Sequence, residues 1–219
     1  NLKQWGIALQ NHHGSLGTFP MGALWTDEDG NAIPHLYLGY RLNYYPLLVP
    51  YLEQQNIHDL FDFSTSSSAP WQPLWYDRNR EAAAAIFPTL FCPSDGYGGT
   101  HHIHPTIPDQ PWSRTNYIGM FTGFQIGDLL QYDPAKRAFF DGNRSTQFKD
   151  ILDGTSNTIA MTEGLREING PDGRGMAWSD QPCGAQVFSE LAPNSPLPDR
   201  CYPVSSWWCM NPDPANNRP

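Results

Sequence analysis

Apolar side chains recur at roughly helical spacing near the start of the chain, at Leu2, Trp5, Leu9 and Leu16. This pattern predicts a helix over residues 1–16, which Gly17 ends and Pro20 cannot continue. No capping residue precedes Asn1, so we expect the helix and the mature protein to begin upstream of it.

Two shorter helices are expected next. Apolar positions at Leu52, Ile57 and Leu60 favour a helix over residues 50–61, and a run of four alanines favours another over residues 79–87. A low-complexity linker at residues 64–70 separates them.

The second half of the chain predicts short strands, because segments rich in Thr, aromatic and β-branched residues alternate with Gly, Asp or Pro. These segments are residues 89–92, 115–122, 138–140, 156–162 and 175–178. Helices followed by strands indicate an α+β fold in one domain, residues 1–219, with a long N-terminal helix packed on an antiparallel sheet.

Composition narrows the functional classes. Net charge is −9 and no basic cluster occurs, so a nucleic-acid partner is not expected. Gly and Pro number 19 and 21, which indicates long loops. No stretch reaches the roughly 18 apolar residues of a membrane span.

Four cysteines are widely spaced and form no CxxC pair. We favour disulfides in an oxidising compartment, hence an extracellular or cell-surface location, over buried free thiols in the cytosol. Cys183 and Cys201 bracket a proline-rich loop and are predicted to pair, which stabilises by about 3 kcal/mol in the chain-entropy model. Cys92 and Cys209 either pair with each other or with cysteines outside this sequence.

Several short motifs occur in one order along the chain. They are residues 1–13 (NLKQWGIALQNHH), 17–20 (GTFP), 48–54 (LVPYLEQ), 91–95 (FCPSD), 116–119 (NYIG), 153–159 (DGTSNTI) with Glu163, and 192–199 (APNSPLPD). Together they resemble a large bacterial family of prepilin-like proteins of unknown function. That family carries an N-terminal cleavage and methylation segment and a C-terminal H-x9-DG motif, which this sequence does not contain.

The resemblance implies a pilin-like head with disulfide-stapled loops, whose first helix continues an upstream stem. It implies a non-catalytic structural subunit of a filament or surface assembly, partnered by copies of itself and attached to the membrane only through the stem. It also favours a partner for Cys92 or Cys209 outside this sequence, because the family often has a cysteine just before the position of Asn1.

The segment Asp153–Thr158 is the most conspicuous motif. Asp-Gly favours a tight turn, and the Thr, Ser and Asn side chains that follow can bond the backbone around it. A nucleophilic Ser156 is the alternative, but no G-x-S-x-G surrounds it. We therefore expect a structural turn that leads into a strand.

Two further groups suggest metal chemistry. Asp27, Asp29 and Asn31 have the alternate spacing of a calcium loop, yet Leu36 stands where the ligating Glu belongs, which favours an exposed acidic turn. Three clustered histidines could bind a transition metal, but a solvated loop is the favoured interpretation. They are His101, His102 and His104. No cofactor is expected, with calcium as the alternative.

Surface features leave one other function open. Asn143-Arg144-Ser145 is an N-glycosylation sequon. Tryptophans expected in loops could form a carbohydrate platform, which makes a secreted carbohydrate- or ligand-binding module the alternative to a structural subunit. They are Trp71, Trp75, Trp112, Trp207 and Trp208. A hydrolase is disfavoured, because no nucleophile, base and orienting group can be assembled from the motifs.

Overall fold

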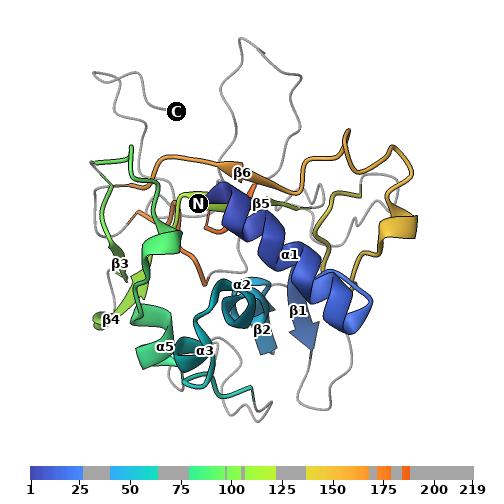
Figure 1. The fold of residues 1–219 in the computed structure, drawn as a ribbon. Helices are drawn as coiled ribbons and strands as arrows, with labels where there is room; N and C mark the ends of the chain where they lie inside the picture. Colours follow the sequence, from blue (N-terminus) through green and yellow to red (C-terminus); the bar gives the residue numbers. More distant parts are fainter. Residues whose placement is uncertain are drawn as a thin grey trace, which may run out of the picture.

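The computed structural model describes residues 1–26, 40–63, 79–96, 98–104, 107–121, 137–167, 172–178 and 184–187. This part of the chain is α+β, as the sequence predicts (Figure 1). The calcium candidates Asp27, Asp29 and Asn31 lie outside these ranges, as do Cys183, Cys201 and Cys209.

The first helix, α1 (Leu2–Leu16), confirms the predicted helix. Its buried face consists of Trp5, Ala8, Leu9 and His12, whereas Leu16 is exposed. The helix ends at Gly17, which takes the left-handed conformation (φ 74°) and donates its N–H to the carbonyl of His13. Glycine at this position ends a helix without the steric penalty of a side chain.

The helix predicted over residues 50–61 is instead divided. The predicted range holds most of the 3-10 helix η1 (Val49–Leu52) and all of α3 (Gln55–His58), and α2 (Tyr45–Leu48) precedes it. Glu53 interrupts it with a left-handed backbone (φ 61°) between η1 and α3. The apolar spacing that suggested one helix therefore spans two short ones.

The remaining helical turns are short. The alanine run forms α5 (Arg80–Ala84), inside the predicted range. The 3-10 helix η2 (Pro88–Leu90) occupies the first half of residues 89–92, where the predicted strand is wrong because the chain turns after Pro88. A third 3-10 helix, η4, covers Phe148–Asp150.

Within the described ranges, three small sheets occur where one antiparallel sheet was predicted. β1 (Ala23–Thr26) pairs antiparallel with β2 (Tyr40–Asn43), and β3 (His101–His104) pairs antiparallel with β4 (Ile107–Ser113). The third sheet has the order β6-β5-β7, from Met161–Glu163, Tyr117–Met120 and Gln186–Val187. Its β5–β6 pair is antiparallel and its β5–β7 pair is parallel.

The strand predictions succeed only in part. Residues 115–122 contain β5, while residues 156–160 are turn and irregular backbone, so that residues 156–162 reach β6 only at their end. Residues 138–140 and 175–178 contribute isolated bridges, Phe121 to Phe140 and Arg114 to Met176. β1 and β2 lie outside all the predicted strand ranges.

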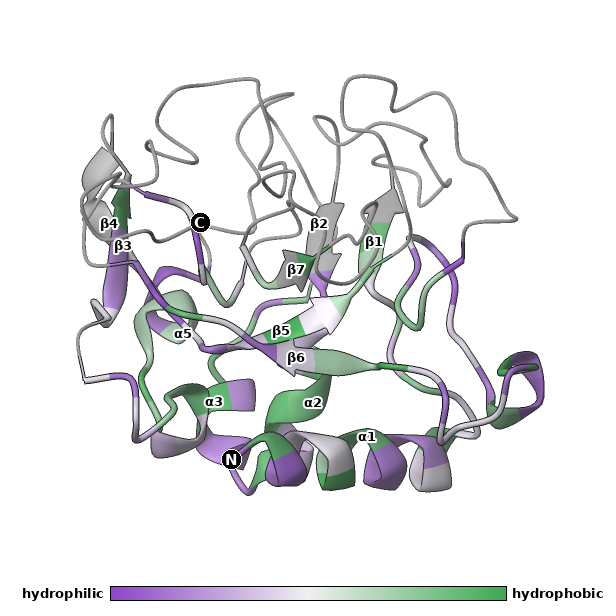
Figure 2. Cartoon of the chain, turned by 90° about the horizontal axis from the view of Figure 1, so that it is seen from above, coloured by the Kyte–Doolittle hydropathy of each residue, from purple (hydrophilic) through white to green (hydrophobic). Residues whose placement is uncertain are grey.

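The helices and the third sheet share one aromatic core. α1 contacts η1, α2 and β6, and Figure 2 shows it along one side of the described fold, with α2 and the β5–β6 pair behind it. The Trp5 ring lies edge-on to Tyr45, with centroids 4.8 Å apart, and its Nε1 donates to the Thr89 carbonyl at 3.0 Å. Tyr45 Oη in turn donates to the Tyr117 carbonyl of β5.

Candidate functional site

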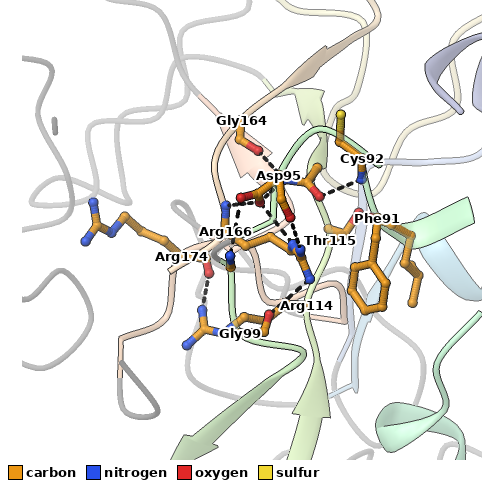
Figure 3. Close-up of polar contacts among 12 residues, drawn as sticks. Phe91, Cys92, Asp95, Gly99, Arg114, Thr115, Gly164, Arg166 and Arg174 are labelled. Atoms are coloured by element: carbon orange, nitrogen blue, oxygen red, sulfur yellow. Dashed lines mark hydrogen bonds and ion pairs between the residues drawn. The ribbon is translucent and has the colours of Figure 1, made fainter. Parts of the chain in front are cut away.

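A buried ion pair lies where the turn after η2 meets the segment after β6 (Figure 3). Asp95 and Arg166 form this pair, with Nε of Arg166 3.1 Å from Oδ2 of Asp95. Both side chains are buried. Buried charges of this kind are found paired, because an unpaired one is costly to desolvate.

The Asp95 carboxylate accepts several hydrogen bonds. Nδ2 of Asn116 donates to Oδ2 at 2.6 Å, and the backbone N–H of Arg166 donates to the same oxygen at 3.3 Å. Burial alone raises the pKa of Asp95, but the bonds from Asn116 and Arg166 and the charge of Arg166 outweigh it. The net effect holds the pKa below its usual value, so the group is ionised.

Arg166 uses its remaining donors on main-chain carbonyls. Its Nη2 donates to the carbonyl of Asp95 at 2.9 Å and its Nη1 to that of Gly99 at 3.3 Å. The guanidinium also lies 4.2 Å from the centroid of the Phe91 ring, a cation–π contact. Arg166 therefore fastens the segment after β6 to two neighbouring turns.

Asn116 joins the same turn to β5 and β6. Its Oδ1 accepts the N–H of Cys92 at 2.8 Å, and its Nδ2 also donates to the Gly164 carbonyl at 2.8 Å. The Asn116 amide is thus shared among three segments, which explains a buried asparagine at the start of β5.

A second charged group surrounds Arg114, at the end of β4. The Arg114 side chain is fully buried and donates to the carbonyls of His101 (3.2 Å), Asp172 (2.6 Å) and Arg174. Burial lowers the pKa of Arg114 to about 10, against the opposing charges of Asp172 and Glu167. The guanidinium therefore stays protonated and closes the 172–178 segment onto β3 and β4.

Arg174 completes this group. It contacts the carboxylates of Asp172, at 3.1 Å, and of Glu167. Burial alone lowers the pKa of Arg174, but the bonds and charges of these two carboxylates raise it above its usual value. Asp172 and Glu167 are thus both bound to Arg174, an arrangement that holds the two neighbouring loops together.

The predicted histidine cluster is a strand, β3, and not a solvated loop. Nε2 of His101 lies 3.0 Å from the Ala84 carbonyl and its Nδ1 lies 3.1 Å from Oγ1 of Thr100. His102 is buried, stacks on Trp112 at 5.2 Å, and places Nδ1 3.0 Å from the Asp172 carbonyl. The side chain of His104 lies outside the described part.

Adjacent strand residues point to opposite faces, which separates the first two rings. Among the described residues, no group of three His, Cys, Asp or Glu side chains is placed to hold a metal ion.

Trp112 is not a displayed ring. It is 2% exposed, in the middle of the β3–β4 hairpin, so its assignment to a carbohydrate platform is wrong. The sequence did not predict this hairpin, because its prolines and histidines favour a loop. Trp112 was therefore expected to be exposed. The other platform candidates, Trp71, Trp75, Trp207 and Trp208, lie outside the described residues.

The turn at residues 153–158 confirms the structural interpretation of its motif. Gly154 has a positive φ of 85°, Asn157 Nδ2 donates to the Asp153 carbonyl at 2.8 Å, and Thr158 Oγ1 donates to the Gly154 carbonyl at 3.2 Å. The stabilising side chains are Asn157 and Thr158, and β6 follows at Met161.

Two remaining candidates are visible. Asn143, the sequon residue, is half-buried with a left-handed backbone (φ 55°), and its N–H donates to the Ala23 carbonyl at 2.7 Å. Asparagine tolerates this conformation well, so the turn itself explains the residue. Cys92 is a half-buried free thiol, and it is the only cysteine within the described ranges.

Sequence reasoning missed the charged group altogether. Asp95 belonged to a motif quoted for the family resemblance, but nothing in the sequence links it to Arg166, 71 residues away. Arg114 carried no signal either, because a lone arginine in a strand is usually exposed.

Comparison with protein families gives a match over nearly the whole chain. Residues 1–218 match the model of a family described as "Protein of unknown function (DUF1559)". No curated protein and no solved structure gives a significant match. Among the described helices, none has the length and apolar character needed to cross a membrane.

Proposed function

Because this chain belongs to the family described as protein of unknown function (DUF1559), we propose that it has the role implied by its sequence motifs. That role is a non-catalytic structural subunit of a pilus-like filament or surface array. It acts outside the cell or at the cell surface and contacts copies of itself. In this proposal α1 continues the helix of an upstream pilin-like stem, and that stem provides any membrane attachment.

The observation that carries the proposal is a set of exposed apolar side chains on α1 and on the chain around β6. Four large aliphatic side chains from α1 and from the segment around β6 are 60% or more exposed. They are Leu16 (64%), Leu152 (91%), Ile159 (64%) and Leu165 (60%). Exposed apolar side chains that gather on one side of a folded chain mark a surface that other molecules cover.

The two segments that carry these side chains run side by side. β6 contacts α1, and the ring of Phe148 in η4 lies 4.3 Å from that of His13 near the other end of α1. In the view of Figure 2, the chain from η4 to β6 runs roughly parallel to α1. We propose that Leu16, Leu152 and Ile159 form one surface, which we call the apolar ledge.

The ledge is held in a defined shape. Leu152 and Ile159 flank the turn that the Asn157 and Thr158 side chains fix. A turn fixed in advance loses little conformational entropy when a partner binds, which favours a repeated contact between subunits.

The charged groups support a structural role in another way. The carboxylates of Asp95, Asp172 and Glu167 are each bound to an arginine. Their ionic contacts tie turns and strands together, a use of charge suited to a scaffold.

Sedimentation velocity of the full-length protein tests the proposal. The wild-type protein is expected to associate as its concentration rises. In a Leu152→Ser, Ile159→Ser double variant, the protein concentration at which half of the chains are associated should rise by tenfold or more. Burying one such side chain is worth about 1.5–3 kcal/mol. Ile86→Ser is the matched control, because Ile86 is also exposed but follows α5, on another part of the fold.

Association that the double variant and the control weaken equally would contradict a role for the ledge. A wild-type protein that stays monomeric at every concentration would contradict the proposed function itself.

A further inference from the structure

The C-terminal turn of α1 is fastened by a buried histidine. His12 is 5% exposed, and its Nδ1 lies 2.8 Å from the carbonyl of Thr18, just beyond the helix end. A carbonyl can only accept, so Nδ1 carries the hydrogen and Nε2 is the atom that can take up a further proton. The His12 ring lies 5.4 Å from that of Tyr51 on η1.

The adjacent side chain joins the same turn to a third segment. The His13 ring lies 4.8 Å from Phe19 and 4.3 Å from Phe148 of η4. The N–H of Phe19 donates to the Thr146 carbonyl at 2.8 Å. Contacts of His12, His13 and Phe19 therefore hold the helix end, the following loop and η4 together.

We propose that this turn is an acid-sensitive latch: protonation of buried His12 releases the end of α1 from Thr18, Phe19 and Phe148 while the rest of the fold stays closed. The latch is a property of the single chain, so it goes beyond the structural role proposed above. It needs no ligand and no partner.

Three influences act on His12. Burial lowers its pKa most, the Thr18 carbonyl raises it, and the charge of neighbouring His13 lowers it, which leaves the pKa below 6.5. The groups that face the ring are His13 on its own helix, Tyr51 on η1 and the Thr18 carbonyl.

The sign of the effect follows from linkage. The closed turn binds the proton less tightly than the open one, so the latch is fully stabilised above about pH 6.5. That stabilisation is lost as the pH falls from there through the pKa of His12 in the closed turn. The opening constant rises by up to about tenfold per pH unit across this window.

Amide hydrogen exchange of the full chain tests the latch. Protection factors of the Gly17 and Phe19 amides are expected to fall as the pH is lowered from about 7.5 to 5, by up to about tenfold per unit. The Gly119 amide, which donates to the Ala185 carbonyl at 2.9 Å in the third sheet, should keep its protection factor and serves as the internal reference. Equal losses at all three amides, or no loss at Gly17 and Phe19, would overturn the proposal.

Two variants separate the histidines. His12→Gln keeps a neutral side chain that can donate, and it should abolish the pH dependence at Gly17 and Phe19. His13→Gln is the matched control and should retain it. If the His12 variant does not fold, an NMR titration of the wild-type imidazoles decides, and a His12 pKa at or above 6.5 would refute the latch.

Discussion

Nε of Arg166 lies 3.1 Å from Oδ2 of Asp95, and both side chains are buried although 71 residues separate them in the sequence. The pair joins the turn after η2 to the segment after β6. A buried pair that also bonds backbone carbonyls and an asparagine is costly to break, because the remaining charge has no compensation.

Replacing Asp95 should therefore destabilise the protein strongly. Asp95→Asn removes the charge that balances Arg166 at nearly constant size, and we expect a loss of about 3 kcal/mol in the free energy of unfolding. Urea denaturation measures it. Asp59→Asn is the control, since the Asp59 side chain is 65% exposed and should change stability by less than about 0.5 kcal/mol. Equal losses in the two variants would show that the buried pair is not a special contact.

The same pair predicts part of the acid sensitivity. The pKa of Asp95 is lowered in the folded protein, so its contribution to stability is present above the unfolded pKa of about 4 and is lost as the pH falls through the folded pKa. Wild-type stability should decline below about pH 4 more steeply than that of Asp95→Asn. Chemical denaturation at a series of pH values gives both slopes, and parallel slopes would contradict the assignment.

Alanine substitutions at two glycines are predicted to change the stability in opposite directions. A Cβ on Gly6 of α1 would meet no atom within 4 Å, so Gly6→Ala should stabilise by about 1 kcal/mol through helix propensity. Gly175 has a φ of 74°, and a Cβ there would lie 2.8 Å from the Thr115 carbonyl oxygen. Gly175→Ala should therefore destabilise by more than about 1 kcal/mol. Thermal denaturation measures both changes in stability. If both variants shifted the melting temperature in the same direction, the prediction would be refuted.

The cysteines supply a chemical prediction. Non-reducing peptide mapping of protein from its native compartment should find Cys183 linked to Cys201, which closes the proline-rich loop between them. Cys92, a free thiol within the described chain, should be linked to neither of them. Recovery of Cys183 and Cys201 as unmodified thiols would contradict the disulfide and weaken the case for an oxidising compartment.

Local patterns in the sequence predict the local elements well. The spacing of Trp5 and Leu9 indicates α1 and its buried face, and Gly17 marks its end. Asp153-Gly154 indicates the turn before β6. In these cases the signal and the structure lie within a few residues of each other, so propensity and periodicity suffice.

Features that depend on distant contacts were not predictable. The left-handed backbone at Glu53 divides a segment whose apolar spacing suited one helix. His102 and Trp112 stack across a hairpin, although the prolines near them in the sequence favour a loop. His12 lies near the end of a predicted helix, and nothing close to it in the sequence shows that the loop after α1 and Tyr51 of η1 contact its ring.

The candidate site was the least predictable part. The Asp95–Arg166 pair and the carbonyls around Arg114 come from segments far apart in the chain, and one sequence holds no signal that joins them. The ledge was equally unpredictable from the sequence. Leu152 and Ile159 are apolar and would be expected in the core, but both are exposed in the structure.

Electron cryomicroscopy of the protein in its native setting tests the structural role most directly. The predicted result is an ordered filament or array in which each subunit contacts the next and the ledge of Leu16, Leu152 and Ile159 is covered. Isolated single chains with no ordered neighbour, and with this ledge facing solvent, would contradict it.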